Sequence, residues 1–167
     1  MSLSGLRPHG YRGHMARILL IHHSPTESTQ RIADAAMSAA QIPELEELGD
    51  LELIEVAALE PDIDQVLAAD AYVLGTTANF GYISGALKHF FDTVYDHVRE
   101  PTAGRPFSYW IHGGYDTTGA EKAMEAITTG LGWSLAQQPV VWTGAVEDEH
   151  LERVQEMTAT VMAATAD

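Results

Sequence analysis

The chain has 167 residues, of which 46% are hydrophobic and 20% charged, a composition that suits one ordinary globular domain. Its 24 acidic and 9 basic residues give a net charge of −15. A surface this negative repels nucleic-acid phosphates and anionic lipid headgroups, so we expect neither nucleic acid nor a membrane as a partner. The absence of cysteine excludes disulfides, thiolate metal sites and a Cys nucleophile. Redox chemistry in this chain therefore needs a cofactor.

The N-terminal residues have no periodic pattern. They are polar, contain glycine and lack the basic-then-apolar layout of a signal peptide. No apolar run approaches the roughly 20 residues that span a bilayer. We expect a flexible lead-in at residues 1–15, a single domain at residues 16–167 and a cytoplasmic location.

The first half of the domain alternates strands and helices. A continuous apolar run at residues 17–21 predicts a central strand that is covered on both faces. After a polar segment at 22–29, apolar residues at helical spacing over 32–39 predict a helix. The run 51–56 predicts a second strand, and its two glutamates place it at a sheet edge.

The same alternation continues through the rest of the chain. The expected elements are, in order, a short helix at 63–69, an apolar strand at 71–75, a loop at 76–83, a helix from Ser84 to Val98, a strand at 107–111, a loop at 113–117, a helix at 118–131, a short strand at 140–142 and a last helix that begins at the acidic residues 147–149. Gly130 and Gly132 are expected to end the helix at 118–131.

This alternation is typical of parallel strands joined by right-handed crossovers, with helices on both faces. We predict an α/β fold with a doubly wound parallel sheet of about five strands in the order 2-1-3-4-5. Ligands of such sheets bind outside the carboxyl ends of the strands, where the strand order reverses. The loops that follow the first, third and fourth strands are therefore the candidate site.

The first of these loops carries four hydroxyl side chains between a strand end and a helix start: Ser24, Thr26, Ser28 and Thr29. Unpaired N–H groups and the positive end of the helix dipole favour an anion there, such as a phosphate. The loop lacks the Gly-x-x-x-x-Gly-Lys-Ser/Thr spacing, which excludes Walker-type nucleotide hydrolysis. A helix cap made by Ser28 or Thr26 is an equally supported interpretation.

The second and third loops offer small and aromatic residues to a flat ring. The second contains Thr77, Ala78, Asn79, Phe80, Gly81 and Tyr82. Asn79 provides both a donor and an acceptor for the edge of a heterocycle. In the third loop, Gly113 and Gly114 permit close approach of the backbone. The alternatives are that the aromatic residues only cover a helix end and that the glycines only form a tight turn.

Residues 18–29, 75–92 and 112–120 together resemble the FMN-binding segments of the flavodoxin-like family, and most closely its branch of NAD(P)H-dependent FMN reductases and quinone oxidoreductases. The most specific part is Gly-x-x-Ser-Gly-x-Leu-Lys-x-Phe-Phe-Asp at 81–92. The resemblance implies that the four hydroxyls of the first loop hold the FMN phosphate. It also implies that residues 77–82 and 112–115 border the isoalloxazine ring.

One residue departs from the family pattern. Glu27 stands where phosphate loops of this family usually have glycine. An inward carboxylate would repel the phosphate. An outward one, in the first turn of the helix, would interact favourably with the helix dipole.

The resemblance implies an enzyme in which FMN takes hydride from NADH or NADPH and passes electrons to a quinone or a similar flat small molecule. We expect the backbone N–H groups of Gly113 and Gly114 to face the pyrimidine edge of the ring, Tyr82 and Tyr115 to wall the ring, and His112 to donate a proton. A purely structural role for His112 stays open. We further expect a homo-oligomer, a dimer or tetramer. The alternatives are a non-catalytic electron carrier and a relative that has lost its cofactor.

Other chemistries lack their sequence signals. His22 and His23 are adjacent and point to opposite faces of a strand, and His89 and His97 are two helical turns apart, so we expect no metal site and explain the helix histidines as surface residues. The segment 81–85 has one residue too many before its serine for a Gly-x-Ser-x-Gly hydrolase elbow.

Overall fold

A computed structural model describes residues 15–166, so the expected lead-in up to His14 lies outside the described residues. The elements are, in order, β1 (Ala16–His22), α1 (Glu27–Met37), the 3₁₀ helix η1 (Ser38–Gln41), α2 (Pro43–Glu46), β2 (Leu51–Ala57), α3 (Ile63–Ala68), β3 (Ala71–Asn79), β4 (Tyr82–Ile83), α4 (Gly85–Val98), β5 (Pro106–Gly113), α5 (Thr118–Leu131), β6 (Ser134–Leu135), β7 (Val140–Thr143) and α6 (Asp148–Ala163).

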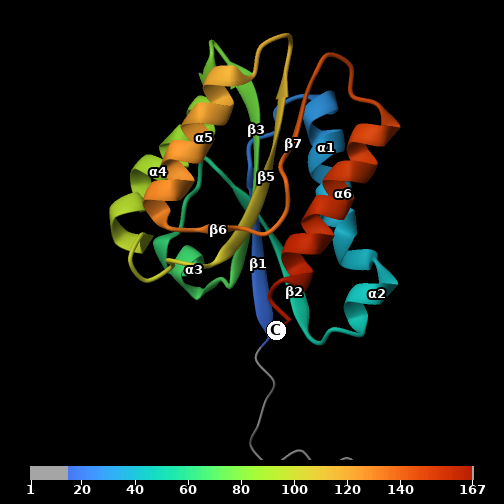
Figure 1. Ribbon diagram of the computed structural model, residues 1–167, viewed down its shortest axis with the longest axis vertical. Helices are drawn as coiled ribbons and strands as arrows, with labels where there is room; N and C mark the ends of the chain where they lie inside the picture. The colour runs from blue at the N-terminus through green and yellow to red at the C-terminus, as the bar shows by residue number, and fades with distance from the viewer. Residues whose placement is uncertain (1–14, 167) are drawn as a thin grey trace, which may run out of the picture.

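The strands form one sheet with helices on both faces (Figure 1). Its parallel strands follow the order β2-β1-β3-β5, and β6 and β7 both pair with β5 at the far edge. With β7 as the fifth long strand, this is the predicted order 2-1-3-4-5. Helices α3, α4 and α5 cover one face, and α1, α2 and α6 cover the other. The predicted flavodoxin-like architecture is therefore confirmed.

Burial of the central strand on both faces explains its continuous apolar run. Leu19 and Ile21 belong to the core beneath α3, α4 and α5, whereas Ile18 and Leu20 belong to the core beneath α1 and α6. Strand β2 lies at the sheet edge, as its glutamates predict. Within residues 15–166, no helix combines the length and apolar character needed to cross a membrane.

The prediction of a loop at 76–83 was wrong, because most of this segment forms a β-hairpin. Strand β3 continues past Gly75 to Asn79 and then pairs antiparallel with β4, Asn79 opposite Tyr82. Phe80 and Gly81 between them have φ values of +50° and +75°, which is the two-residue turn preferred by hairpins. The apolar run stops at Gly75, but pairing with β5 continues up to Thr77, and backbone pairing of this kind needs no apolar side chain.

The predicted end of α5 is half right. Gly132 has φ +72° and ends the helix in the left-handed conformation. Gly130 lies inside the helix instead, where a Cβ would stand 2.0 Å from the Tyr95 hydroxyl. Its lack of a side chain therefore serves the packing of α5 against α4 and does not terminate the helix.

Candidate functional site

The three loops predicted to form the site lie together at the carboxyl edge of the sheet (Figure 1). The hairpin turn after β3 also touches the start of α5. A Cβ on Gly119 would stand 1.8 Å from the carbonyl oxygen of Gly81, so only a glycine permits this approach. The second loop and the helix that follows the third loop are thus fixed against each other.

A cavity of about 460 Å³ opens between the second and third loops. It is lined by Ala78, Asn79, Phe80, Gly81, Gly114, Tyr115 and Asp116. Its size lies within the range of small-molecule sites. The side chain of Phe80 is fully exposed and that of Tyr115 is 92% exposed. Two aromatic side chains without a covering partner, beside one cavity, fit a flat aromatic ring such as isoalloxazine.

The remaining residues predicted to border the ring lie next to this cavity without lining it. Thr77 is half-buried in β3, and Tyr82 is exposed in β4. Gly113 is buried, and a Cβ there would stand 3.1 Å from both Ala78 Cβ and Thr117 Cγ2. The lack of a side chain at Gly113 therefore lets the end of β5 lie close to Ala78, which lines the cavity. This is the close backbone approach expected from the glycines of the third loop.

Asp116 is a cavity residue that the sequence interpretation missed. Its carboxylate accepts a hydrogen bond from the backbone N–H of Thr118 at 3.0 Å, and this bond lowers the pKa of Asp116. The side chain is therefore ionised at neutral pH and places a negative charge at the rim of the cavity. An Asp just before a helix often accepts a hydrogen bond from a backbone N–H of the first helical turn. The position of Asp116 before α5 is therefore a sequence signal for this bond.

Two of the four hydroxyls of the first loop, those of Thr26 and Thr29, form the N-terminal cap of α1. Thr26 Oγ1 accepts from the Thr29 N–H at 3.2 Å, and Thr29 Oγ1 accepts from the Thr26 N–H at 3.0 Å. The capping interpretation is thus confirmed for Thr26. Ser28 is exposed in the first turn. Hydroxyls and free N–H groups at a helix start also fit a phosphate.

Glu27 is the first residue of α1 and is exposed. A carboxylate there interacts favourably with the helix dipole.

His22 is the residue of this region that the sequence interpretation missed most clearly. It ends β1 on the same face as Ile18 and Leu20, and its side chain is 7% exposed. Its Nδ1 lies 2.7 Å from Ser24 Oγ, and its Nε2 lies 2.7 Å from Glu55 Oε1 of β2. His22 and His23 were expected on opposite faces of a strand, and the period of β1 places His22 beside Leu20 on a covered face while His23 is exposed.

His112 lies outside the cavity lining. Its Nε2 is 2.6 Å from the carbonyl oxygen of Gly144. A carbonyl only accepts, so the Nε2 proton is donated to Gly144 and links β5 to the loop after β7. The imidazole also packs against Trp142, with ring centroids 5.0 Å apart. Within residues 15–166, no group of three or more His, Asp or Glu side chains is arranged to hold a metal ion.

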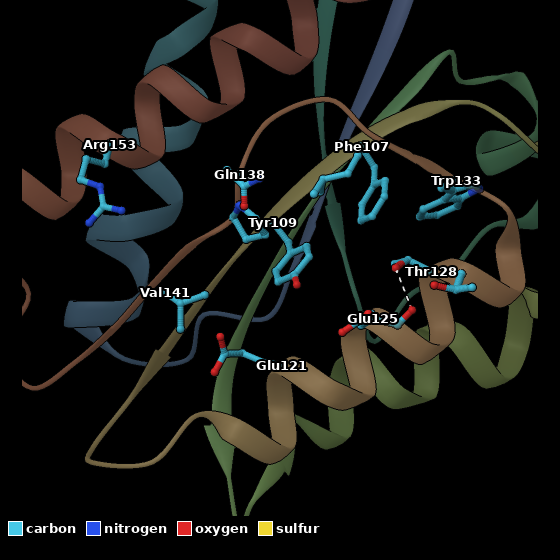
Figure 2. Close-up of a pocket in the computed structure, with 12 residues that line it drawn as sticks. Phe107, Tyr109, Glu121, Glu125, Thr128, Trp133, Gln138, Val141 and Arg153 are labelled. Atoms are coloured by element: carbon cyan, nitrogen blue, oxygen red, sulfur yellow. Dashed lines mark hydrogen bonds between the residues drawn. The ribbon is translucent and has the colours of Figure 1, made fainter.

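A second cavity, of about 500 Å³, lies beside β5 and α5 (Figure 2). Phe107 and Tyr109 project into it from β5 towards α5, which contributes Glu121 and Glu125. Burial raises the pKa of Tyr109, and the two carboxylates raise it further. Arg153 of α6 also lines this cavity, and none of the predicted site residues does. Most of the predicted ring residues line the cavity at the carboxyl edge instead.

Comparisons with known proteins identify the family to which the chain belongs. A family model described as NADPH-dependent FMN reductase matches residues 16–148. A search of curated protein sequences finds no match. Among solved structures, a WrbA-like flavodoxin from Agrobacterium tumefaciens is similar with a TM-score of 0.69 and 16% identity, over 90% of this chain and 97% of that one.

Two further structures show the same fold. The apo form of an NADH:FMN oxidoreductase gives a TM-score of 0.67 and 16% identity, over 89% of each chain. The two-electron reduced flavodoxin of Megasphaera elsdenii gives 0.65 and 16% identity, over 85% of this chain and 98% of that one. The family match spans most of the domain. The chain therefore belongs to the NADPH-dependent FMN reductase family and is a flavin oxidoreductase that binds FMN and takes electrons from NAD(P)H.

Proposed function

We propose that this enzyme passes electrons from NAD(P)H through bound FMN to a quinone or a similar flat small molecule. The observation that carries the proposal is the cavity between the second and third loops, where Phe80 and Tyr115 are exposed beside an open space. A bound FMN supplies the hydride chemistry. The protein then needs only to hold two flat substrates in turn against one ring face.

We assign the phosphate of FMN to Ser24, Thr26, Ser28 and Thr29. The ring is assigned to Thr77, Ala78, Asn79, Phe80, Gly81 and Tyr82 together with Gly113 and Gly114. Backbone N–H groups of the two glycines face the pyrimidine edge, where negative charge develops on reduction. Tyr115 walls the ring. His112 remains the candidate proton donor, through Nδ1, because its Nε2–H already donates to the Gly144 carbonyl.

The phosphate assignment predicts a preference among flavins. FMN is expected to bind more tightly than riboflavin or FAD, because only FMN brings a terminal phosphate monoester to the start of α1. Titration of the apoprotein with each flavin, followed by flavin fluorescence, measures the three dissociation constants. Equal affinities for FMN and riboflavin would remove the phosphate site.

Within the first loop, Thr29→Ala is expected to weaken FMN binding by about 1–2 kcal/mol, because its hydroxyl is assigned to a charged acceptor. The same change removes half of the capping pair with Thr26, so riboflavin affinity serves as the control for damage to the fold.

Glu27→Gly is a second change in the same loop and is compared with Thr29→Ala. The change removes an exposed negative charge from the start of α1, so FMN affinity is expected to stay the same or to rise. Loss of FMN binding in Glu27→Gly would mean that the carboxylate itself contributes to the site.

The acceptor is tested by steady-state kinetics. Initial rates with NAD(P)H and a benzoquinone are expected to give the parallel double-reciprocal lines of a ping-pong reaction, because both substrates use one ring face. Saturable turnover with free flavin alone, and none with the quinone, would replace the quinone with flavin as the acceptor.

A non-catalytic electron carrier is the second candidate function. Two observations favour it: the similarity to flavodoxin structures and the net charge of −15, which suits docking on a basic redox partner. The carrier predicts electron uptake from a reductase protein and none from free nicotinamide.

We further propose a single domain over residues 16–167, a cytoplasmic location and a homo-oligomer, either a dimer or a tetramer. The exposed aromatic residues Phe80, Tyr82 and Tyr115 support the oligomer, since a partner subunit can cover them. Light scattering coupled to size exclusion measures the mass, and a monomer at micromolar concentration would contradict the oligomer.

A further inference from the structure

The phosphate loop lacks a basic side chain. Residues 22–30 contain no lysine or arginine, and the chain carries a net charge of −15. A phosphate dianion bound there would have only hydroxyls, backbone N–H groups and a helix dipole as its partners. His22 is a buried titratable side chain in contact with this loop, through Ser24.

The hydrogen bonds of His22 decide what Ser24 can offer to a phosphate. A carboxylate only accepts, so the bond to Glu55 puts a proton on Nε2 of His22. If the imidazole is neutral, Nδ1 is bare and takes the hydroxyl proton of Ser24. The Ser24 oxygen then presents only lone pairs, which repel a phosphate oxygen.

A second proton on His22 reverses this arrangement. Nδ1–H then donates to Ser24 Oγ, and the hydroxyl proton of Ser24 is free to point at the phosphate. The imidazolium also places a positive charge one side chain away from the dianion. Glu55 at 2.7 Å stabilises that charge, and because the His22 ring is buried while the Glu55 side chain is 46% exposed, solvent screens part of this attraction.

We infer that His22 is the cationic partner of the phosphate: binding of a phosphate monoester through Ser24 is coupled to uptake of one proton from solvent onto Nδ1 of His22. This inference rests on the proposed assignment of Ser24 to the FMN phosphate. It identifies a positioning residue for the cofactor that lies on a strand and not in the loop itself.

The groups around His22 are few. From β2, Glu55 is its charged contact, and from β5 the neutral indole of Trp110 lies 6.4 Å away, centroid to centroid. His23 and Glu27 are close in the chain but exposed, so solvent screens their charges. A change of protonation near the phosphate is therefore assigned to the pair of His22 and Glu55.

The test is the pH dependence of phosphate recognition. The dissociation constants of FMN and riboflavin are measured by fluorescence between about pH 6.5 and about pH 9.5, where the monoester is mainly dianionic. The ratio of the riboflavin constant to the FMN constant is expected to fall with rising pH, by up to about tenfold per unit over part of this range. Riboflavin has the same ring, so the ratio isolates the phosphate.

Variants separate His22 from its surroundings. In His22→Gln, which cannot become charged, the ratio is expected to be independent of pH and about tenfold lower than wild type at the acidic end. His23→Gln is the matched control and is expected to keep the wild-type dependence. Glu55→Gln removes the stabilising carboxylate, so the fall in the ratio is expected at lower pH.

Three results distinguish the claims. A preference for FMN that is flat with pH in the wild type would overturn the role of His22 and leave the FMN site intact. Failure of the wild type to bind FMN at any pH would overturn the site itself. If His22→Gln does not fold, nitrogen NMR of the wild type decides the matter: with FMN bound, both ring nitrogens of His22 are expected to carry protons, and a bare Nδ1 would contradict the inference.

Discussion

Gly119→Ala is expected to weaken FMN binding at least about tenfold and to destabilise the fold by about 1–3 kcal/mol. The added Cβ would stand 1.8 Å from the carbonyl oxygen of Gly81, far inside van der Waals contact. The hairpin turn must move away from α5, and this turn carries Phe80 and Gly81 of the ring cavity. Alanine normally stabilises a helix relative to glycine, so a loss of stability here has the opposite sign to propensity.

Gly85→Ala provides the matched control for this change. Gly85 is the first residue of α4, and a Cβ there would meet nothing within 4 Å. Its flavin affinity is expected to equal wild type, with stability unchanged or raised by up to about 1 kcal/mol. Urea unfolding and FMN titration of both variants measure these effects. Wild-type FMN affinity in Gly119→Ala would show that the hairpin does not form the ring site.

Gly75→Ala is expected to have the largest effect on stability, a loss of about 3 kcal/mol. Gly75 pairs with Trp110 across the sheet, and a Cβ on Gly75 would stand 2.0 Å from Trp110 Cζ2. The indole is 3% exposed and packed in the core beneath α1 and α6, so it has no free space to move into. Its ring also lies beside His22, and its displacement is expected to weaken FMN binding.

A double-mutant cycle tests this explanation. In a Trp110→Phe background, the smaller ring leaves room for the Cβ, so Gly75→Ala is expected to cost at least about 1 kcal/mol less than it does with Trp110 present. If Gly75→Ala lowers the free energy of unfolding equally in both backgrounds, contact with the indole of Trp110 does not explain the need for glycine at position 75.

The sequence predicts the architecture well because the central strands are buried on both faces. The continuous apolar runs of β1 and β3 can form only where helices cover both sides, and the glutamates of β2 fit only an edge. The strand order follows from these constraints. The extension of β3 to Asn79 and the short strands β4 and β6 were missed, because their pairing depends on backbone hydrogen bonds and not on apolar pattern.

The sequence predicts which loops form the candidate site, but it does not predict the contacts between their side chains. Six residues of the predicted ring segments line the cavity: Ala78, Asn79, Phe80, Gly81, Gly114 and the catalytic candidate Tyr115. The link between His22 and Glu55 joins residues 33 apart in the chain, and only the register of β1 against β2 brings them together. Asp116 lines the same cavity from a turn that is held by its bond to Thr118. The spacing of apolar residues does not predict such a turn.

The most direct test of the proposed function is anaerobic stopped-flow mixing of the FMN-loaded protein with NADH and, separately, with NADPH, followed by a second mixing with a benzoquinone. We predict that at least one nicotinamide removes the visible absorbance of the oxidised flavin at a rate that saturates with its concentration, and that the quinone restores it. If neither nicotinamide changes this absorbance while an added flavodoxin reductase does, the enzyme account is contradicted and the protein is an electron carrier.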